Sequence, residues 1–391
     1  MSYNQNYFDY TKEKYMWKEI KYSKKQIDKA GQTIIKEGIS EEERKQCLEI
    51  IDNWRAVHAF PMNTFAINLK KKIGGRMGPI VVQRLKRLDT IVEKLARFPD
   101  MQLSRMQDLG GCRVILPKIE DVYAMRDKIV KSSIRHKLHN EKDYIKSPNP
   151  HTGYRGIHLI YKYKSDRNTK YNGLFIEIQL RTKLQHMWAT AVETVGMFTQ
   201  NGLKFNQGEK EWLQFFQLVS CVFAVEEEKD KLTDLIDVVQ HMAVIKELLA
   251  LVNKFDIFNK LYAFAAATIV INQSNKPKNK FDKEGYYLLE LDLDSRDLKL
   301  TYYPKGEKSA NRAIEKYMEI ETNKDTKTNA VLVSAKSITA LKKAYPNYFA
   351  DIKDFTDKLL KFVKEQNDKC GEILKSAENS FVESIMPVIA K

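Results

Sequence analysis

The sequence has 391 residues, of which 43% are hydrophobic and 30% charged, a composition that supports two or three folded domains. It contains no run of about 18 apolar residues and no apolar core near its first residue, so we expect a cytoplasmic protein without a membrane span or a signal peptide. The net charge of +15 favours polyanionic partners such as nucleotides or RNA, and a lysine-rich surface without such a partner is the alternative.

The first part of the chain, residues 1–60, is predicted to be a helical segment. Apolar residues recur at three- and four-residue spacings over Lys24–Lys36 and Ser40–Phe60. The run Ser40–Glu43 has the spacing of a capping box, which marks the start of a helix. Pro61 and a group of glycines then predict a break in helical structure.

Residues 61–200 alternate between strand-like and helix-like patterns. Strands are predicted at Ile80–Arg87, Cys112–Leu116, Ile157–Lys164 and Leu174–Arg181. Helices are predicted from a second capping box at Thr90–Glu93 to about Phe98, over Ile119–Ser132 and over Thr182–Met197. This order predicts an α/β domain in which helices flank a mixed sheet.

The remainder of the chain is predicted to contain a helical segment, a linker and a second α/β unit. Residues 201–272 are mostly helical in pattern, and residues 273–285 form a polar, lysine-rich linker. The C-terminal unit, residues 286–391, is predicted to contain a hairpin of Tyr286–Leu293 and Leu298–Tyr303. A helix near Ala310–Thr322, a strand at Ala330–Ala335 and terminal helices are expected to complete this unit.

Three polar residues, Glu177, Gln179 and Arg181, alternate with apolar residues in the predicted strand at Leu174–Arg181. A period of two places them on one face, opposite the apolar face. A carboxylate there can share a metal ion with Asp108 or accept a proton from a ribose hydroxyl. The alternative for Glu177 is a structural ion pair with Arg181 on the sheet face.

Four further residues predict a site for metal and phosphate. Asp108 precedes two glycines and a strand, a position that suits Mg²⁺ binding; a turn cap is the alternative. Arg84 and Lys86 lie two apart on one strand face, and Lys94 lies in the helix that follows. Three cations near a helix N-terminus can hold a triphosphate, and a basic surface strand is the alternative.

Tyr154 and His158 lie in and just after a glycine turn. An exposed tyrosine in such a turn can stack on a nucleobase, and packing on the sheet is the alternative. His158 can bind a phosphate or a ribose, or it can be a hydrogen-bonded core residue.

Six short motifs together resemble, in order and spacing, the synthetase domain of the RelA/SpoT family over about residues 60–200. They are RLKR at Arg84–Arg87, Lys94, DLGGCRVI at Asp108–Ile115, KDYI at Lys142–Ile145, GYRGIH at Gly153–His158 and EIQLRT at Glu177–Thr182. The resemblance implies a nucleotidyltransferase-like α/β fold. It also implies an enzyme that moves the β,γ-pyrophosphate of ATP onto a ribose 3′-hydroxyl.

The resemblance also implies a role for each candidate residue. Asp108 and Glu177 would hold Mg²⁺, and Glu177 would activate the attacking hydroxyl. Arg84, Lys86 and Lys94 would bind ATP. Tyr154 would stack on the acceptor base, and Lys142, His158, Gln179 and Arg181 would support the acceptor and the metal site. Phosphoryl chemistry needs positioning and charge neutralisation more than covalent help, which agrees with this set.

The identity of the acceptor stays open between GDP or GTP, which would give a guanosine alarmone, and the 3′ CCA end of tRNA. A basic residue that such synthetases usually carry just before the Gly-Tyr turn is absent, because the sequence there is SPNPHTGY. No His-Asp dipeptide marks a hydrolase domain, so the chain is expected to make its product and not to degrade it. An inactive nucleotide- or RNA-binding sensor is a further alternative. The C-terminal unit is expected to inhibit the enzyme or to sense a ligand.

Overall fold

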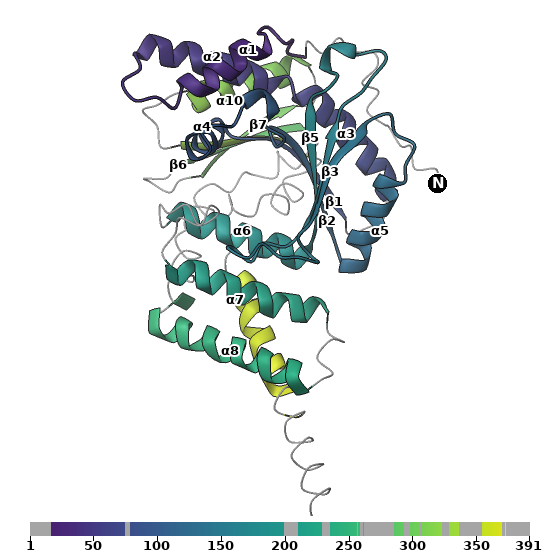
Figure 1. Cartoon of the computed structure of the whole chain (residues 1–391), viewed down its shortest axis with the longest axis vertical. Helices are drawn as coiled ribbons and strands as arrows, with labels where there is room; N and C mark the ends of the chain where they lie inside the picture. Colours follow the sequence, from purple (N-terminus) through teal and green to yellow (C-terminus); the bar gives the residue numbers. More distant parts are fainter. Residues whose placement is uncertain are drawn as a thin grey trace, which may run out of the picture.

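The computed structural model describes residues 17–74, 79–198, 210–228, 235–255, 257–258, 261, 285–292, 298–304, 307–322, 328–335, 354–369 and 372. Its main feature is a five-stranded sheet with the strand order β1-β2-β5-β4-β3 (Figure 1). The strands are β1 (Ile80–Leu85), β2 (Gly110–Leu116), β3 (Lys137–Asp143), β4 (Ile157–Lys162) and β5 (Phe175–Thr182). β2 and β5 pair in parallel and the other pairs are antiparallel, so the predicted mixed α/β sheet is confirmed.

The two faces of the five-stranded sheet differ in chemistry. Helices α3 (Ala59–Ile73) and α5 (Ile119–Val130) cover one face, and α6 (Lys183–Phe198) lies on the other side (Figure 1). Apolar side chains such as Val114, Ile178 and Leu180, all 0% exposed, fill the face under α3 and α5. The alternation of the strands therefore leaves the opposite face for polar side chains.

The N-terminal helices are capped as the sequence predicts, and α4 is not. Ser23 makes a capping box at α1 (Lys24–Thr33), and Ser40 accepts from the Glu43 amide at α2 (Glu41–Ala56). The predicted capping box at Thr90 is wrong, because α4 (Leu88–Arg97) begins two residues earlier with Arg87 as its N-cap. The Thr90 hydroxyl donates instead to the carbonyl of Arg87 at 2.8 Å.

Two elements contradict the expected pattern. Pro61 does not break a helix, because it lies in the first turn of α3, where the backbone N–H has no intrahelical partner to lose. Strand β3 was not expected, since its sequence KLHNEKD is polar apart from Leu138. It forms an edge strand on β4, and an edge strand tolerates polar residues on both faces. Two short 3₁₀ turns, Leu103–Arg105 and Thr169–Tyr171, complete this part.

The predicted helices of the middle segment are present as α7 (Lys210–Glu227) and α8 (Leu235–Phe255). They share an apolar cluster with α6 and with the helix at 354–369, which crosses them in yellow in Figure 1. Phe355 and Leu359 of that last helix are 1% and 0% exposed. The last helix therefore packs on the middle segment, which differs from the expectation that it completes the C-terminal unit.

The C-terminal unit contains a three-stranded antiparallel sheet of β7 (Leu298–Pro304), β6 (Gly285–Asp292) and β8 (Thr328–Ala335), with α10 (Glu307–Thr322) against it. The expected pairing of β6 with β7 is confirmed, and its turn and the linker up to residue 284 lie outside the described residues. The domain boundaries remain a prediction.

A contact between Arg55 and Tyr317 joins the C-terminal unit to the N-terminal helices. Arg55 Nη1 donates to the Tyr317 hydroxyl at 3.1 Å, and its guanidinium lies 5.2 Å from the Tyr317 ring centre.

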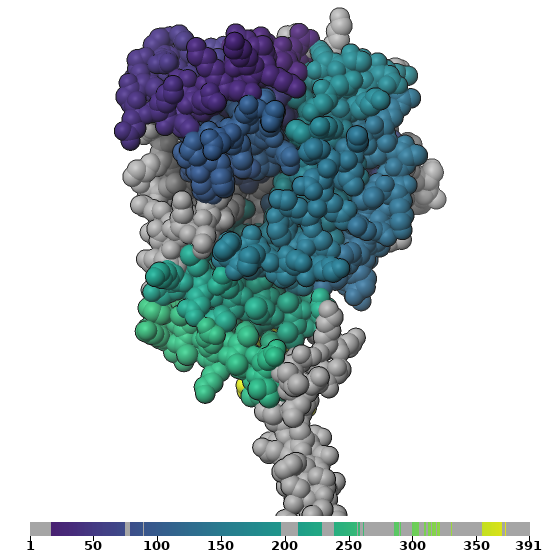
Figure 2. Space-filling model, in the orientation of Figure 1, coloured from purple at the N-terminus to yellow at the C-terminus, as the bar shows by residue number. Residues whose placement is uncertain are grey.

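Figure 2 shows the N-terminal helices at one end of the molecule and α7 and α8 at the other. None of the helices in the described part is both long and apolar enough to span a membrane.

Candidate active site

The strand register places the predicted acceptor residues on one face of the sheet. Lys142 lies opposite His158, His158 lies opposite Gln179, and Gln179 lies opposite Arg113. Residues that face each other across a sheet point to the same side. Glu177 and Arg181 share that side with Gln179, because each lies two residues from it along β5. We call this side of the sheet the site face.

Glu177 and His158 form a half-buried ion pair at the centre of the site face. His158 Nδ1 lies 2.9 Å from Glu177 Oε1, and Gln179 Nε2 donates to Glu177 Oε2 at 2.7 Å. Burial alone would raise the pKa of Glu177, but the charge and hydrogen bond of His158, together with Gln179 and Lys86, lower it to about 2. Burial likewise favours neutral His158, yet Tyr154 and Glu177 raise its pKa to about 9.

Tyr154 extends this chain of contacts. Its hydroxyl lies 2.6 Å from His158 Nε2 and accepts from Arg181 Nε at 3.0 Å, and the Arg181 guanidinium lies 4.9 Å from its ring centre. Burial would raise the pKa of Tyr154, but Arg181 and His158 lower it. Of the described polar groups, none accepts a hydrogen bond from Arg181 Nη1, which is buried. The site face therefore holds a guanidinium with a donor to spare.

Asp108 forms ion pairs with two lysines at the other end of the site. Lys86 Nζ donates to Asp108 Oδ2 at 3.0 Å, and Lys94 Nζ donates to Oδ1 at 2.9 Å and to Oδ2 at 3.0 Å. These side chains are 18% to 23% exposed, so a ligand can reach them. Arg84 lies two residues before Lys86 and opposite Gly111, as the predicted alternation requires.

The parallel pair of β2 and β5 connects the two carboxylates, because Asp108 lies just before β2 and Glu177 lies in β5. Gly111, three residues after Asp108, lies opposite Glu177. A side chain at Gly111 would place its Cβ 3.9 Å from Glu177 Oε2, so the glycine leaves the space above that carboxylate open. Lys86 pairs with Asp108 and also lowers the pKa of Glu177, which places one cation near both acids.

This donor set fits Mg²⁺ better than a metal held by protein alone. No group of three or more His, Cys, Asp and Glu side chains that could hold a metal occurs in the described ranges. Mg²⁺ typically takes one or two carboxylates and fills its shell with water and substrate phosphate. Asp108 and Glu177 would be those ligands.

The start of β2 after Asp108 packs on a buried histidine. A Cβ on Gly110 would lie 3.0 Å from the Cβ of His58, which is 1% exposed. His58 Nδ1 lies 2.8 Å from the carbonyl oxygen of Trp54. Burial lowers the pKa of His58 to about 4, so a neutral ring packs against Gly110.

The structure bears on the structural alternatives that the sequence left open. The alternative for Glu177, an ion pair with Arg181, is not what the structure has, because Glu177 pairs with His158 while Arg181 bonds to Tyr154 and Gln179. Asp108 binds lysine side chains instead of capping a turn through its carboxylate. Tyr154 and His158 contact each other on the site face, and their roles toward an acceptor stay a prediction.

Sequence reasoning missed Arg113. Its Nε donates to Gln179 Oε1 at 3.2 Å, and Arg181 Nη2 donates to the same oxygen at 3.0 Å. Burial, together with the charges of Arg181 and Arg84, lowers the pKa of Arg113 to about 10. The signal was present, because Arg113 is the charged residue between Cys112 and Val114, which both point to the apolar face.

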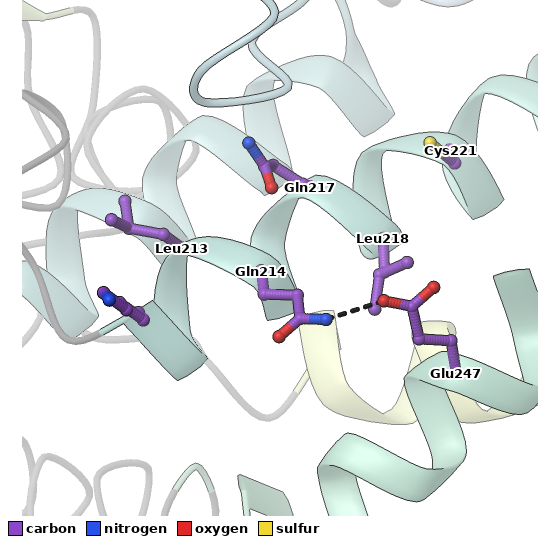
Figure 3. Close-up of a pocket in the computed structure, with 7 residues that line it drawn as sticks. Leu213, Gln214, Gln217, Leu218, Cys221 and Glu247 are labelled. Atoms are coloured by element: carbon purple, nitrogen blue, oxygen red, sulfur yellow. Dashed lines mark hydrogen bonds between the residues drawn. The ribbon is translucent and has the colours of Figure 1, made fainter.

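A surface pocket lies away from this chemistry, between α7 and α8 (Figure 3). It is lined by Lys210, Leu213, Gln214, Gln217, Leu218, Cys221 and Glu247, and none of these is a predicted site residue. Within the pocket Gln214 donates to Glu247 at 2.6 Å. The candidate active site is therefore the site face and not this pocket.

A comparison with known families finds one match in this part of the chain. Residues 83–200 match the model of a family described as "Region found in RelA / SpoT proteins". These residues form a RelA/SpoT-family synthetase domain. The matched range includes every predicted site residue, from Arg84 to Arg181.

Curated relatives of this RelA/SpoT domain include two proteins of Bacillus subtilis strain 168. The chain is 28% identical to GTP pyrophosphokinase YjbM over 112 residues, which are 28% of this chain and 52% of that protein. It is 31% identical to GTP pyrophosphokinase YwaC over 113 residues, which are 27% of this chain and 52% of that protein. The chain thus spans about half the length of the curated relatives that it matches.

Among solved structures, the chain is similar to small alarmone synthetase 1 from Bacillus subtilis bound to its product pppGpp. The identity is 21% and the TM-score is 0.40, and the match covers 47% of this chain and 94% of that one.

Proposed function

We propose that the protein is an ATP-dependent pyrophosphokinase that transfers the β,γ-pyrophosphate of ATP to a ribose 3′-hydroxyl. The observation that carries this proposal is the pair of carboxylates with cations around them: Asp108 lies just before β2, and Glu177 lies in β5, the strand that pairs with β2. The match of this region to the RelA/SpoT family and the names of its pyrophosphokinase relatives support the same reaction class.

In this proposal Lys86, Lys94 and Arg84 bind the phosphates of ATP. The two lysines now neutralise Asp108, and phosphate oxygens are equally good partners for an ammonium group. Mg²⁺, held by Asp108 and Glu177, would supply further charge neutralisation when bound. The protein's part is to position the phosphates and to stabilise the charge that develops on them.

Glu177 is proposed to accept the proton of the attacking hydroxyl. Its carboxylate is ionised at neutral pH and lies between His158 and the lysines of the site. Gln179 fixes its orientation through one hydrogen bond, and Arg113 and Arg181 fix Gln179 in turn. A base held by such a network is oriented before the substrate arrives.

The acceptor is proposed to be GDP or GTP, bound by Tyr154 with Lys142, His158, Gln179 and Arg181 around it. The spare donor at Arg181 Nη1 supports an anionic acceptor. Tyr144, whose ring centre lies 5.5 Å from that of Tyr154, adds a second aromatic ring beside the site.

A tRNA 3′ end is the second candidate acceptor, and one observation favours it. The turn from Tyr144 to Gly156 contains two basic residues other than histidine, Lys146 and Arg155. Arg155 is paired with Glu227, and Lys146 is exposed. The turn thus offers little for the phosphates of a mononucleotide, and an RNA could be held by the basic surface elsewhere.

The test is to incubate the full chain with γ-labelled ATP and Mg²⁺ and to offer GDP, GTP or tRNA in turn. Label on GDP or GTP is the expected result. Label on tRNA alone, with affinity that falls steeply as salt rises, would select the second candidate, because Lys and Arg contacts to RNA phosphates release counterions. Label on no acceptor would overturn the proposed reaction and favour an inactive sensor.

We also propose that the C-terminal unit regulates this enzyme. Arg55 connects the two parts, since it donates to Tyr317 of α10 and, at 3.5 Å, to the carbonyl of Lys86 next to the ATP site. Truncation near residue 280 is a poor test, because it also removes Phe355 and Leu359 from the cluster around α7. Tyr317→Phe is sharper: raised pyrophosphate transfer supports inhibition by this unit, and unchanged transfer argues against it.

A further inference from the structure

Side chains of helix α7 donate hydrogen bonds to the turn that carries Tyr154. Gln217 Nε2 donates to the carbonyls of Pro150 at 3.3 Å and His151 at 2.7 Å. Ser220 Oγ donates to the carbonyl of Gly153 at 2.5 Å. Because Gln217 and Ser220 lie three residues apart, they occupy the same face of α7.

The turn and α7 are also in close steric contact. Gly153 has a φ of +76°, and a Cβ there would lie 3.1 Å from both Gln217 Cα and Ser220 Cβ. Within the turn, Gly153 N donates to Asn149 O at 2.8 Å and Asn149 N donates to Tyr154 O at 3.1 Å. The turn therefore has one conformation as long as α7 stays in place.

The end of α7 adds a buried ion pair to these contacts. Arg155 Nη1 lies 2.6 Å from Glu227 Oε2, and both side chains are 5% exposed. Glu227 also accepts from Gln185 Nε2 at 3.0 Å and from the hydroxyl of Thr182, the last residue of β5. One carboxylate thus joins the acceptor turn to the strand that carries Glu177.

We propose that Glu227 is a positioning residue for the acceptor: through Arg155 and Thr182 it fixes Tyr154 and the end of β5 in the arrangement that the acceptor needs. Glu227 contacts Arg155, Thr182 and Gln185, which are neighbours of the proposed acceptor residues, so it acts through them. This inference rests on the proposed pyrophosphokinase activity and concerns its acceptor side alone. On the ATP side, the side chains of Lys86, Lys94 and Asp108 bond to one another.

The test is Glu227→Gln in the full chain, with KM measured separately for ATP and for the acceptor that the labelling assay identifies. The variant keeps the shape and removes the nearer of the two carboxylates paired with Arg155, leaving Glu228 at 3.7 Å. We expect the KM of the acceptor to rise about tenfold and that of ATP to change less than about twofold. Glu247→Gln is the matched control. It also removes a carboxylate bonded to a glutamine of α7, but Glu247 lines the surface pocket between α7 and α8 (Figure 3).

Ser220→Ala tests the same role in case Glu227→Gln folds poorly. It removes one hydrogen bond to the turn and leaves the buried charges paired. We expect it to raise the KM of the acceptor about threefold at an unchanged melting temperature. Unchanged acceptor KM in both variants, or equal changes in the KM values of both substrates, would overturn the positioning role.

Hydrogen exchange of residues 149–156 separates this inference from the proposed reaction. Faster exchange in Glu227→Gln, with the expected change in acceptor KM, supports positioning. Faster exchange with no change in acceptor KM overturns it while the proposed reaction stands. A wild-type chain that labels no acceptor overturns the proposed reaction, and an acceptor role for Glu227 falls with it, whatever the exchange shows.

Discussion

The two halves of the site are built in different ways. The ATP half, namely Arg84, Lys86, Lys94 and Asp108, comes from 25 consecutive residues and has partly exposed ion pairs. The acceptor half consists of the proposed acceptor residues Lys142, Tyr154, His158, Gln179 and Arg181, together with Arg155 next to Tyr154. Its ion pair between Arg155 and Glu227 is 5% exposed and depends on a helix 72 residues further along the chain.

The difference shows which half can change when a ligand binds. Ion pairs near the surface are weak, and a phosphate group can replace Asp108 as the partner of either lysine. Breaking a buried pair leaves an uncompensated charge and is strongly unfavourable. We therefore expect the ATP half to rearrange its partners on binding and the acceptor half to stay as it is.

The largest effect is expected where the two halves meet. Glu177→Gln keeps the shape of the side chain and removes its charge, so the metal loses a ligand and the hydroxyl loses its base. We expect turnover to fall by about two orders of magnitude or more, measured with labelled ATP at a temperature where the variant is folded. The melting temperature should also fall, because His158 loses its carboxylate partner. Glu120→Gln, an exposed change on α5, is the control. Near-normal turnover would remove Glu177 from the mechanism.

In the ATP half, Lys94→Met should mainly weaken ATP binding. It removes an ammonium group that would bind a phosphate and leaves Asp108 with Lys86 alone. A charge-assisted hydrogen bond contributes about 2 kcal/mol, so we expect the KM of ATP to rise about thirtyfold and that of the acceptor to change little. Lys131→Met, which removes a 77% exposed lysine at the end of α5, should leave both constants unchanged. Equal effects on both substrates would contradict the division into halves.

Acid should lower the stability of the protein through His58, the buried histidine that packs against Gly110 next to the ATP half. The pKa of His58 is about 4 in the folded protein and ordinarily about 6.5, so the unfolded chain binds the proton first as pH falls. The free energy of unfolding should therefore fall by about 1.4 kcal/mol per pH unit from this group as pH drops below 6.5 towards 4. His136 and His241, whose pKa values burial also lowers, add to the slope.

Chemical denaturation at several pH values measures this slope. His58→Gln removes the titrating ring and should flatten the slope, whereas His139→Gln, at an exposed histidine, should not. A slope that is identical in wild type and His58→Gln would show that other groups carry the acid sensitivity.

The smallest effect is expected in the acceptor half from Gly156→Ala. The added Cβ would lie 2.9 Å from the hydroxyl of Tyr154, which must shift and disturb its contacts with His158 and Arg181. A side-chain end can shift at low cost, so we expect a rise of about fivefold in the KM of the acceptor. Gly173→Ala is the control, because that glycine also has a positive φ, +88°, but a Cβ there meets nothing within 4 Å. An equal rise in the KM of the acceptor in both variants would indicate that the effect comes from backbone strain alone.

The ATP half was the more predictable of the two from sequence. Two-residue spacing put Arg84 and Lys86 on one face, and the strand predicted at Cys112–Leu116, which the structure has as Gly110–Leu116, placed Asp108 before its entrance. The alternation in β5 likewise gave the direction of Glu177 and Gln179. These inferences need only local periodicity, and the sheet register confirms them.

The acceptor half was less predictable because its contacts are long-range. No local pattern pairs Arg155 with Glu227, and the polar sequence of β3 hides the strand that places Lys142 opposite His158. The predictions made from Pro61 and Thr90 were wrong for a different reason. Each was read as a helix boundary, and in each case the helix begins two residues earlier than that residue.

The parallel pairing of β2 with β5 also has a consequence for the order of folding. Gly111 and Glu177 meet only after the intervening chain has closed a long loop, and such closure is entropically costly and slow. During synthesis the phosphate-binding segment emerges well before Glu177, and Glu227 emerges later still. The order of translation itself therefore delays assembly of the complete site until more than half of the chain has been made.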